Sequence, residues 1–335
     1  MKVLNLVDRI SETSIPCELV SHMKRRKDIE VDITAVRDQG VFSFIAYIYK
    51  SKYSLLHSHH TKAHLYNLIA KLLFGHGCVI SLHSEFSRLS IFNKVIVFFC
   101  FTLCDSIIAN SENTWKTYPK IFKRFRKKRT VIYNGIDISS WSKKVNNRSR
   151  DESTNSPRSI RVAMVGRLVD AKNYNFIVSV LKKYKLDGFI FDIYGDGKLK
   201  RNLEDVININ SLENKIFLKG EVTREYLFSE LAHYDLFVNC SVSEGFCNAL
   251  FESMYVGLPS ICPNIPVFSE LLPEEYPYLY ESSSIDSFYN ILTKSVEDKV
   301  YYCPNWSKYV ENKFDIDKIA GQVITLYLSV GHKYA

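Results

Sequence analysis

Two kinds of apolar pattern alternate along this chain. Short, nearly continuous apolar runs are typical of strands buried on both faces, and longer segments with an apolar residue every three to four positions are typical of helices. In the first half, we predict strands at residues 2–7, 31–36, 53–57, 78–83, 106–110 and 130–133, with helices between them. Alternation of this kind predicts a parallel sheet covered by helices on both sides.

The same alternation restarts after a polar interruption at residues 139–159, which is typical of a linker or a long loop. Beyond it, we predict strands at residues 160–165, 189–194, 215–218, 236–239 and 259–262. The expected parts are an N-terminal Rossmann-like domain (1–140), a linker (141–159), a C-terminal Rossmann-like domain (160–310) and a terminal helix (311–335). Two such α/β domains in tandem would place a cleft between them, where ligands bind outside the strands' carboxyl ends.

The charge is distributed unevenly. The 335 residues carry a net charge of +8, but residues 1–150 hold 25 Lys and Arg against 11 Asp and Glu, and the remainder is acidic. The densest basic run is Lys120–Arg129, with Phe122 and Phe125 interleaved. A basic half favours a membrane surface, an anionic lipid carrier or nucleic acid as a partner, although solvated helix faces would give the same count. No nucleic-acid-binding motif accompanies the run.

Other segments indicate an intracellular protein. The apolar run at the N-terminus is short and reaches Asp8 early, so no secretory signal is predicted. The most apolar run, residues 95–104, is about half as long as a membrane-spanning helix, and we expect a buried helix there. Eight cysteines are scattered without a CxxC pair, which favours reduced thiols in the cytosol.

Two carboxylates define the stretch on which the functional prediction depends. Glu244 is expected in the loop after a buried strand, and Glu252 about two turns into the next helix, roughly 12 Å away along the helix axis. A nucleotide sugar has about this span, and the N–H groups at the helix N-terminus would face its diphosphate. Taken alone, Glu244 is also explained as an acid favoured by the dipole at a helix N-terminus, and Glu252 as a solvated helix acid.

Two neighbouring strand ends carry further candidate residues. Arg167 and Lys172 follow the strand 160–165, where a guanidinium and an ammonium can bracket a diphosphate. Gly195 lies in a Gly-Asp-Gly turn after the strand 189–194, where glycine permits close backbone approach. Each feature alone fits an ordinary exposed loop, but their coincidence at one edge of a sheet favours a binding site.

These segments resemble a known family. VGRLVDAKN, YGDG, IFLKG, SEGFCNALFESM and VGLP are similar to the nucleotide-sugar domain of retaining glycosyltransferase family 4, in the GT-B class of two Rossmann-like domains that face each other across a cleft. The first half resembles the family more weakly, through LLHSHH, ISLHSE, DSIIANSE and VIYNGID, so that the resemblance covers most of the chain. The resemblance also implies that the terminal helix (311–335) packs back towards the N-terminal domain.

The resemblance implies a role for each matching residue. It places His83 and Glu244 near the transferred sugar as catalytic residues, although His83 is also explained as a structural histidine at a strand end. It implies donor-binding roles for Arg167, Lys172, Gly195, Gly245, Phe246, Cys247, Asn248 and Glu252. Glu252 would accept hydrogen bonds from the ribose. Arg167 and Lys172 would neutralise the diphosphate, so that no metal or other cofactor is expected.

The loop after the first strand differs from the family, and a run of histidines ends the strand at 53–57. The family carries a glycine-rich loop after the first strand, whereas Arg9–Pro16 has no glycine, and only the small Thr13 and Ser14 would let the backbone approach a diphosphate. The run His57-Ser-His-His60 invites a metal-site interpretation, but the sequence nominates no further ligands, and no metal is expected there.

We therefore expect a retaining hexosyltransferase that moves a sugar from a nucleotide diphosphate sugar to a hydroxyl of a glycan or lipid-linked oligosaccharide. UDP is the expected nucleotide and GDP the alternative. The enzyme would serve cell-surface polysaccharide or lipopolysaccharide biosynthesis in the cytoplasm, attached peripherally to the inner face of the membrane through Lys120–Arg129, and no nucleic-acid partner is expected. Two alternatives remain: a nucleotide-sugar epimerase on the same fold, and a non-catalytic basic module that binds membranes or nucleic acid.

Overall fold

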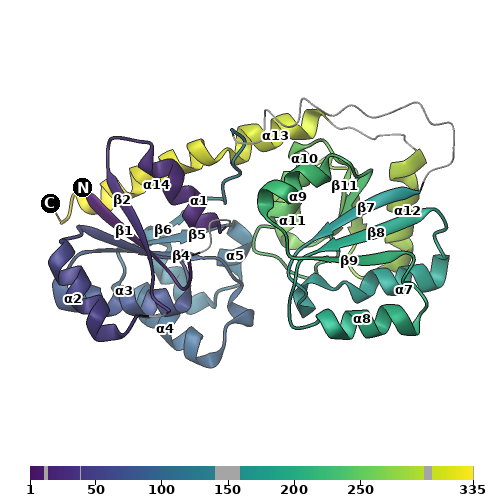
Figure 1. Cartoon of the computed structure of the whole chain (residues 1–335). Coiled ribbons are helices and arrows are strands. Elements are labelled where there is room, and N and C mark those ends of the chain that lie inside the picture. The colour runs from purple at the N-terminus through teal and green to yellow at the C-terminus, as the bar shows by residue number, and fades with distance from the viewer. Residues whose placement is uncertain (11–13, 38, 140–158, 298–303, 335) are drawn as a thin grey trace. The chain divides into compact units, whose positions relative to one another are not determined.

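The computed structural model describes residues 1–335 apart from 11–13, 38, 140–158, 298–303 and 335, and it divides the chain into two α/β units (Figure 1). The first unit comprises Met1–Asp137 together with Phe314–Ala335, and the second comprises Ile138–Lys313. The expected linker at 141–159 lies, except for its last residue, outside the described residues.

The first unit is built on a six-stranded parallel sheet with the order β2-β1-β3-β4-β5-β6. Its strands are β1 (Lys2–Val7), β2 (Glu30–Ala35), β3 (Leu55–Ser58), β4 (Gly77–Leu82), β5 (Ser106–Ala109) and β6 (Arg129–Val131). Its helices are α1 (Ile15–Lys24), α2 (Val41–Ser51), α3 (Thr61–Phe74), α4 (Ile91–Leu103), α5 (Glu112–Lys116) and α14 (Ile316–Gly331), with the 3-10 helices η1 (Phe86–Arg88) and η2 (Lys120–Lys128). The central strands β3, β4 and β5 are buried throughout, as expected for a sheet covered on both faces.

The C-terminal helix α14 is part of the first unit. It packs against α1, as Figure 1 shows, and its Ile319 and Tyr327 share one core cluster with Val3 of β1. The backbone N–H of Ile136 donates a hydrogen bond to the carbonyl oxygen of Phe314, which joins the segment after β6 to the start of α14. The end of the chain therefore completes a core that begins with the first strand.

The second unit has its own six-stranded parallel sheet, with the order β12-β11-β10-β7-β8-β9. Its strands are β7 (Ile160–Val165), β8 (Phe189–Tyr194), β9 (Ile216–Gly220), β10 (Leu236–Val238), β11 (Ser260–Asn264) and β12 (Leu279–Glu281). Its helices are η3 (Asp170–Lys172), α7 (Asn175–Tyr184), α8 (Lys200–Ile209), α9 (Arg224–Leu231), α10 (Asn248–Tyr255), α11 (Pro266–Leu271), α12 (Ile285–Glu297) and α13 (Pro304–Phe314), which ends at the boundary with the first unit.

Candidate active site

The sheet of the second unit reverses its strand order between β7 and β10. Successive strands lead outward from β7 through β8 and β9 on one side, and from β10 through β11 and β12 on the other. The loops that leave the carboxyl ends of two such strands diverge, and α/β proteins bind their ligands in the crevice between them. The loops after β7 (166–173) and β10 (239–247) contain most of the predicted site residues.

Lys172 and Glu244 come from these two loops and form an ion pair. Both side chains are largely buried, with 17% and 12% of their surface exposed. Burial opposes ionisation of both groups, but the positive charge of Lys172 keeps the pKa of Glu244 below its ordinary value, and Glu244 in turn raises the pKa of Lys172. Both groups therefore stay charged at neutral pH.

Two neighbours fix the Glu244 carboxylate. Its Oε1 atom accepts hydrogen bonds from Ser241 Oγ at 2.7 Å and from Asn239 Nδ2 at 3.4 Å. The second carboxylate oxygen, Oε2, makes no hydrogen bond within the described part of the chain, so the contacts of Glu244 anchor one of its two oxygens. Ser241 and Asn239 were not among the predicted site residues; the only sequence signal was a cluster of small polar residues directly after a buried strand.

The glycine turn after β8 packs directly on the loop after β7. A Cβ atom at Gly195 would overlap the carbonyl oxygen of Gly166, and one at Gly197 would lie 2.5 Å from the carbonyl oxygen of Leu168. Gly195 also has a φ of +138°, a conformation that other residues rarely adopt. Glycine at this turn therefore lets two strand-end loops meet backbone to backbone.

A cavity of about 390 Å³ lies at this contact between the loops, within the size range of small-molecule sites. Gly195 and the exposed Arg167 line it, together with Glu221 from the loop after β9. Lys172 and Glu244 do not line it, but Lys172 lies against Gly166, which does. The structure thus brings Arg167 close to Gly195 and Lys172 close to Glu244, and both Gly195 and Lys172 lie against Gly166.

Helix α10 begins directly after Glu244 and its loop. Gly245 is half-buried, Phe246 and Cys247 are buried, and Asn248 is the first residue of the helix. Cys247 precedes the helix in a left-handed conformation with a φ of +75°, and Asn239 Nδ2 donates a hydrogen bond to its sulfur at 3.2 Å. Such a conformation costs a non-glycine residue on the order of 1–3 kcal/mol and is common at binding sites.

Glu252 lies one turn into α10. The expected position, two turns into the helix, is wrong because α10 starts only at Asn248. Glu252 is 5% exposed and forms an ion pair with Arg224, the first residue of α9. Arg224 was missed from the sequence, since a lone arginine on a distant helix gives no local signal of this contact.

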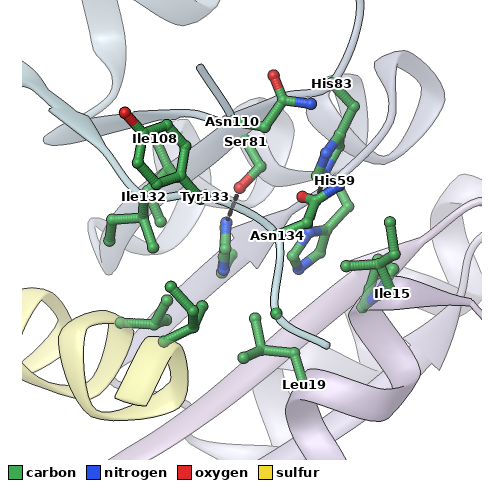
Figure 2. A pocket seen from close by; sticks show the side chains of 15 residues that line it. Ile15, Leu19, His59, Ser81, His83, Ile108, Asn110, Ile132, Tyr133 and Asn134 are labelled. Atoms are coloured by element: carbon green, nitrogen blue, oxygen red, sulfur yellow. Dashed lines mark hydrogen bonds between the residues drawn. The ribbon is translucent and has the colours of Figure 1, made fainter. Parts of the chain in front are cut away.

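His83 lies in the first unit, directly after β4, in a cluster of histidines at the carboxyl edge of the sheet (Figure 2). The ring centroids of His57 and His59 are 4.1 Å apart, and those of His59 and His83 are 5.6 Å apart in a stacked arrangement. His59 follows β3, which lies beside β1 where this sheet reverses its strand order. His57, His59 and His83 line a cavity of about 30 Å³, which is room for a water molecule or a hydroxyl group but not for a sugar ring.

The histidine cluster is uncharged at neutral pH. Burial lowers the pKa of His57, His59, His60, His64 and His83, and for His64 and His83 it lowers the pKa to about 3, with neighbouring histidines adding to the effect. Among the described residues, no group of three or more His, Cys, Asp or Glu side chains is arranged to hold a metal ion.

The loop after β1, which lacks the family's glycines, is described only in part. Thr13 lies outside the described residues. Ser14 precedes α1 in an extended conformation, and its buried hydroxyl makes no hydrogen bond to the described residues.

The basic run at Lys120–Arg129 contains η2 and divides into two groups of cations. Lys128 donates hydrogen bonds to the carbonyl oxygens of Thr102 and Cys104 at the end of α4, and Arg129 pairs with Glu112. These two cations stabilise the fold. The other five are exposed: Lys120, Lys123, Arg124, Arg126 and Lys127.

Helix α4 exposes an apolar face beside these cations. The expectation of a buried helix at residues 95–104 is wrong for this face, which includes Ile91, Phe92, Val95 and Phe99, each at least 51% exposed. The opposite face is buried, and its Phe101 packs on Phe122 of η2 with the ring centroids 4.6 Å apart. Among the helices of the described residues, none is long and apolar enough to cross a membrane.

Comparison with known protein families covers both halves of the chain. The family described as "Glycosyl transferases group 1" matches residues 145–313, half of the chain, and the family described as "Glycosyltransferase Family 4" matches residues 34–140.

Individual relatives are similar over most of the chain. A "UDP-Gal:alpha-D-GlcNAc-diphosphoundecaprenol alpha-1,3-galactosyltransferase" of Escherichia coli is 26% identical over 317 residues, covering 89% of this chain and 81% of the relative. A Campylobacter jejuni enzyme, "N-acetylgalactosamine-N,N'-diacetylbacillosaminyl-diphospho-undecaprenol 4-alpha-N-acetylgalactosaminyltransferase", is 27% identical, covering 71% of this chain and 64% of the relative.

Solved structures share the fold. The crystal structure of Anabaena HepE in complex with UDP-glucose superposes with a TM-score of 0.81 at 20% identity, covering 98% of this chain and all of that one. Two six-stranded parallel sheets with flanking helices, together with these neighbours, assign the GT-B fold. The family match therefore favours sugar transfer over the epimerase and binding-module alternatives. The chain belongs to the group 1 family of glycosyltransferases and is an enzyme of that type.

Proposed function

We propose that this enzyme transfers a sugar from a UDP-sugar to a hydroxyl of a lipid-linked glycan, with retention of the anomeric configuration. The observation that carries the proposal is the buried Lys172–Glu244 pair beside a glycine-lined cavity at the strand-order reversal of the second sheet. A cation and an acceptor oxygen held this close suit the junction between the diphosphate and the sugar of a donor.

In this proposal the diphosphate binds between Arg167 and Lys172. Arg167 is exposed at the cavity and offers a fork of donors, whereas Lys172 is a buried point charge. Negative charge develops on the departing UDP during transfer, and fixed cations in a site shielded from water stabilise it by several kcal/mol. These two cations provide the neutralisation that a metal ion would otherwise supply, so we propose that transfer needs no metal.

The two glutamates bind opposite ends of the donor. Glu244 accepts a hydrogen bond from a sugar hydroxyl through Oε2, the carboxylate oxygen that its protein contacts do not use. Glu252 accepts hydrogen bonds from the ribose, with Arg224 holding its carboxylate in place. Backbone N–H groups around Phe246–Asn248, at the start of α10, supplement the cations at the diphosphate.

The chemical step exchanges one C–O bond for another on the same face of the sugar. The bond between the anomeric carbon and the β-phosphate oxygen breaks, and the acceptor oxygen bonds to that carbon from the side that UDP leaves. The acceptor's proton passes to the departing phosphate oxygen. We propose this route because Glu244, the carboxylate that this proposal places at the sugar, binds a sugar hydroxyl and does not attack the anomeric carbon.

The names of relatives support the choice of substrates. HepE has been crystallised with UDP, with UDP and glucose, and with UDP-glucose. The Escherichia coli and Campylobacter jejuni relatives are named for acceptors on diphospho-undecaprenol, and other Escherichia coli relatives for O-antigen biosynthesis. We therefore propose a cytoplasmic role in cell-surface polysaccharide biosynthesis, lipopolysaccharide included.

A panel of UDP- and GDP-sugars, each incubated with undecaprenyl-diphosphate-linked acceptors and a metal chelator, tests this function through the nucleotide released. We expect UDP release from one sugar class, dependent on the acceptor and unaffected by the chelator. GDP release alone would overturn the choice of nucleotide, and product formed from the donor without any acceptor would overturn transfer.

We further propose that the enzyme binds an anionic membrane surface through the apolar face of α4 and the exposed cations of η2. An exposed apolar stripe with adjoining cations fits the headgroup region of such a bilayer, where each cation contributes about 1 kcal/mol. This placement would bring the enzyme to an acceptor that is itself anchored in the membrane.

Vesicle co-sedimentation tests this placement. Binding should be stronger to anionic than to neutral vesicles, and Phe92→Ser/Phe99→Ser and Lys123→Gln/Arg124→Gln should each weaken it. Ile209→Ser, at a position 80% exposed on α8, serves as a control that removes an apolar side chain from the second unit. Equal binding by all variants would contradict the proposed surface.

A further inference from the structure

A chain of buried hydrogen bonds behind His83 determines which of its ring nitrogens carries the proton. It begins at Asn5 of β1, which is fully buried. The Asn5 amide Nδ2 donates a hydrogen bond to the carbonyl oxygen of Asp32 at 3.5 Å, and the opposite orientation of the amide would set two acceptor oxygens against each other. Asn5 Oδ1 is therefore directed to the other side, towards His59 and Tyr327.

The next link is His59. Asn5 Oδ1 only accepts hydrogen bonds, so His59 must carry its proton on Nε2, which lies 3.0 Å from that oxygen. His59 is neutral, since burial lowers its pKa well below the ordinary value. Its other nitrogen, Nδ1, is therefore bare, that is, unprotonated, and can only accept a hydrogen bond.

The chain ends at His83. His59 Nδ1 lies 3.4 Å from His83 Nε2, and because Nδ1 is an acceptor, His83 must carry its proton on Nε2. His83 Nδ1 is then the bare nitrogen of the ring. It makes no hydrogen bond within the described part of the chain, and the half-buried ring borders the small cavity shown in Figure 2.

A second branch holds Asn5 from the opposite side. The Tyr327 hydroxyl of α14 donates to Asn5 Oδ1 at 3.1 Å and accepts a hydrogen bond from His57 Nδ1 at 2.6 Å. His57 Nε2 is then bare and accepts from Ser81 Oγ at 2.8 Å, the dashed contact in Figure 2. The orientation of the Asn5 amide thus sets the protons of the branch through His59 and His83, and the Tyr327 branch is compatible with it.

We propose that Asn5 and His59 are positioning residues that hold His83 as the Nε2–H tautomer, so that Nδ1 accepts a hydrogen bond from a sugar hydroxyl. This inference rests on the proposed function for the identity of the hydroxyl, but the tautomer itself does not. A bare, uncharged nitrogen attracts a hydroxyl and offers nothing to a phosphate oxygen, which is also an acceptor. His83 Nδ1 can therefore accept a hydrogen bond from a hydroxyl group but not from a phosphate oxygen.

The low pKa of His83 agrees with this role. With its pKa lowered to about 3, His83 stays neutral at pH 7 and is too weak a base to take up the acceptor's proton efficiently. Its contribution is then the orientation of a hydroxyl, and the acceptor's proton goes to the departing phosphate.

Nitrogen NMR of protein labelled at its histidines reads the tautomer directly in the ligand-free enzyme. A bare ring nitrogen and a protonated one give well-separated signals, and the signals of His83 are those that vanish in His83→Gln. We expect His83 at pH 7 to show a protonated Nε2 and a bare Nδ1. The reverse tautomer, or an even mixture, would overturn the inference.

Two substitutions of His59 separate its two hydrogen bonds. Asn places an amide oxygen near the position of Nδ1 and retains an acceptor for His83, whereas Gln reaches the position of Nε2 and retains only the bond to Asn5. We expect the His83 tautomer to persist in His59→Asn and to become mixed in His59→Gln. For His59→Gln, kcat/KM for the UDP-sugar should fall about tenfold, the value of one hydrogen bond, while the affinity for UDP stays unchanged.

Tyr327→Phe is the matched control, because it removes a hydrogen bond of similar burial but leaves the His59–His83 link intact. It should alter the signals of His57 and not those of His83. An unchanged tautomer and unchanged kcat/KM in His59→Gln would overturn the positioning role. A wild-type enzyme that shows the expected tautomer but no UDP-sugar turnover would instead contradict the proposed function, so the two failures are distinguishable.

Discussion

At the scale of single residues, removal of either member of the Lys172–Glu244 pair leaves a buried charge without its counterion. Lys172→Met and Glu244→Gln should each lower the free energy of unfolding by about 3–5 kcal/mol, because the remaining charge is neither solvated nor paired. The double variant should lose much less than the sum of the two. Urea unfolding of the four proteins measures this, and additive losses would show that the two residues do not interact.

The interaction within the same pair should depend on pH. The pKa of Glu244 is lower in the folded protein, so its contribution to stability is complete above the ordinary value of 4.5 and is lost as the pH falls through the folded value. The pKa of Lys172 is raised, so its contribution is complete below the ordinary 10.5 and is lost only above that value. The coupling energy from the double-mutant cycle should therefore be constant between about pH 6 and pH 9 and shrink below pH 4.5. A coupling energy that grows on acidification would contradict the assigned charges.

Some residues of the candidate site could be predicted from the sequence, and some of their contacts could not. Arg167, Lys172, Gly195, Glu244 and Glu252 were nominated because each occupies a strand end or a known motif. Arg224 and the Asn5–His59 link were not, since their contacts arise only when distant segments fold together. Ser241 and Asn239 contact Glu244 within one loop, but small polar residues are common in loops and do not by themselves indicate such a contact. Spacing along the chain identifies residues that share an element, and side-chain hydrogen bonds between elements leave no such periodic signal.

At the scale of elements, the turn after β8 packs directly on the loop after β7. Gly195→Ala should destabilise the protein and weaken UDP binding, because its Cβ overlaps the Gly166 carbonyl oxygen and forces the loops apart. Gly188→Ala is the matched control: Gly188 also has a positive φ, of +90°, but no atom lies within 4 Å of its added Cβ.

We expect Gly188→Ala to cost roughly 1–2 kcal/mol for the backbone conformation alone, and Gly195→Ala to cost about 1–3 kcal/mol more for the overlap. Thermal unfolding and UDP titration of the two variants measure this. Equal losses of stability, with UDP affinity retained in both, would show that the loops do not need their close contact.

The elements themselves were largely predictable. Buried parallel strands such as β4 give continuous apolar runs, and the helices between them have apolar residues every three to four positions. The exposed face of α4 was not predictable, because its sequence is apolar on nearly every side and periodicity cannot tell which side the protein covers. Glu252 was placed a turn too deep for a different reason: the backbone at Cys247 takes a left-handed conformation, which delays the start of α10.

At the scale of the whole molecule, the two units differ in how the chain builds them. The second unit is one continuous segment, Ile138–Lys313, whereas the first needs Phe314–Ala335 as well as Met1–Asp137. Helix α14 contributes Ile319, Val323 and Tyr327 to the core beside β1 and β3. The sequence indicated a terminal amphipathic helix but not which side chains it would bury, because that depends on long-range packing.

Shortened chains test this division. Residues 138–313 alone should fold and bind UDP, since the proposed donor site lies wholly within them. Residues 1–137 should unfold cooperatively only when 314–335 are joined to them through a short glycine-rich connection. A stable, cooperative fold for residues 1–137 alone would contradict the structural role of α14.

Calorimetric titration of UDP into Arg167→Gln measures whether the donor's diphosphate binds at the strand-order reversal of the second unit. Arg167 is exposed, so its substitution should leave the fold intact. Lys182→Gln removes an exposed charge from the last turn of α7, at the opposite edge of the same sheet, and serves as the control. We predict that Arg167→Gln weakens UDP binding by about 10- to 100-fold, the value of a charge-assisted contact, and that Lys182→Gln has no effect. Equal UDP affinity in the wild type and in Arg167→Gln would show that the diphosphate does not bind at Arg167.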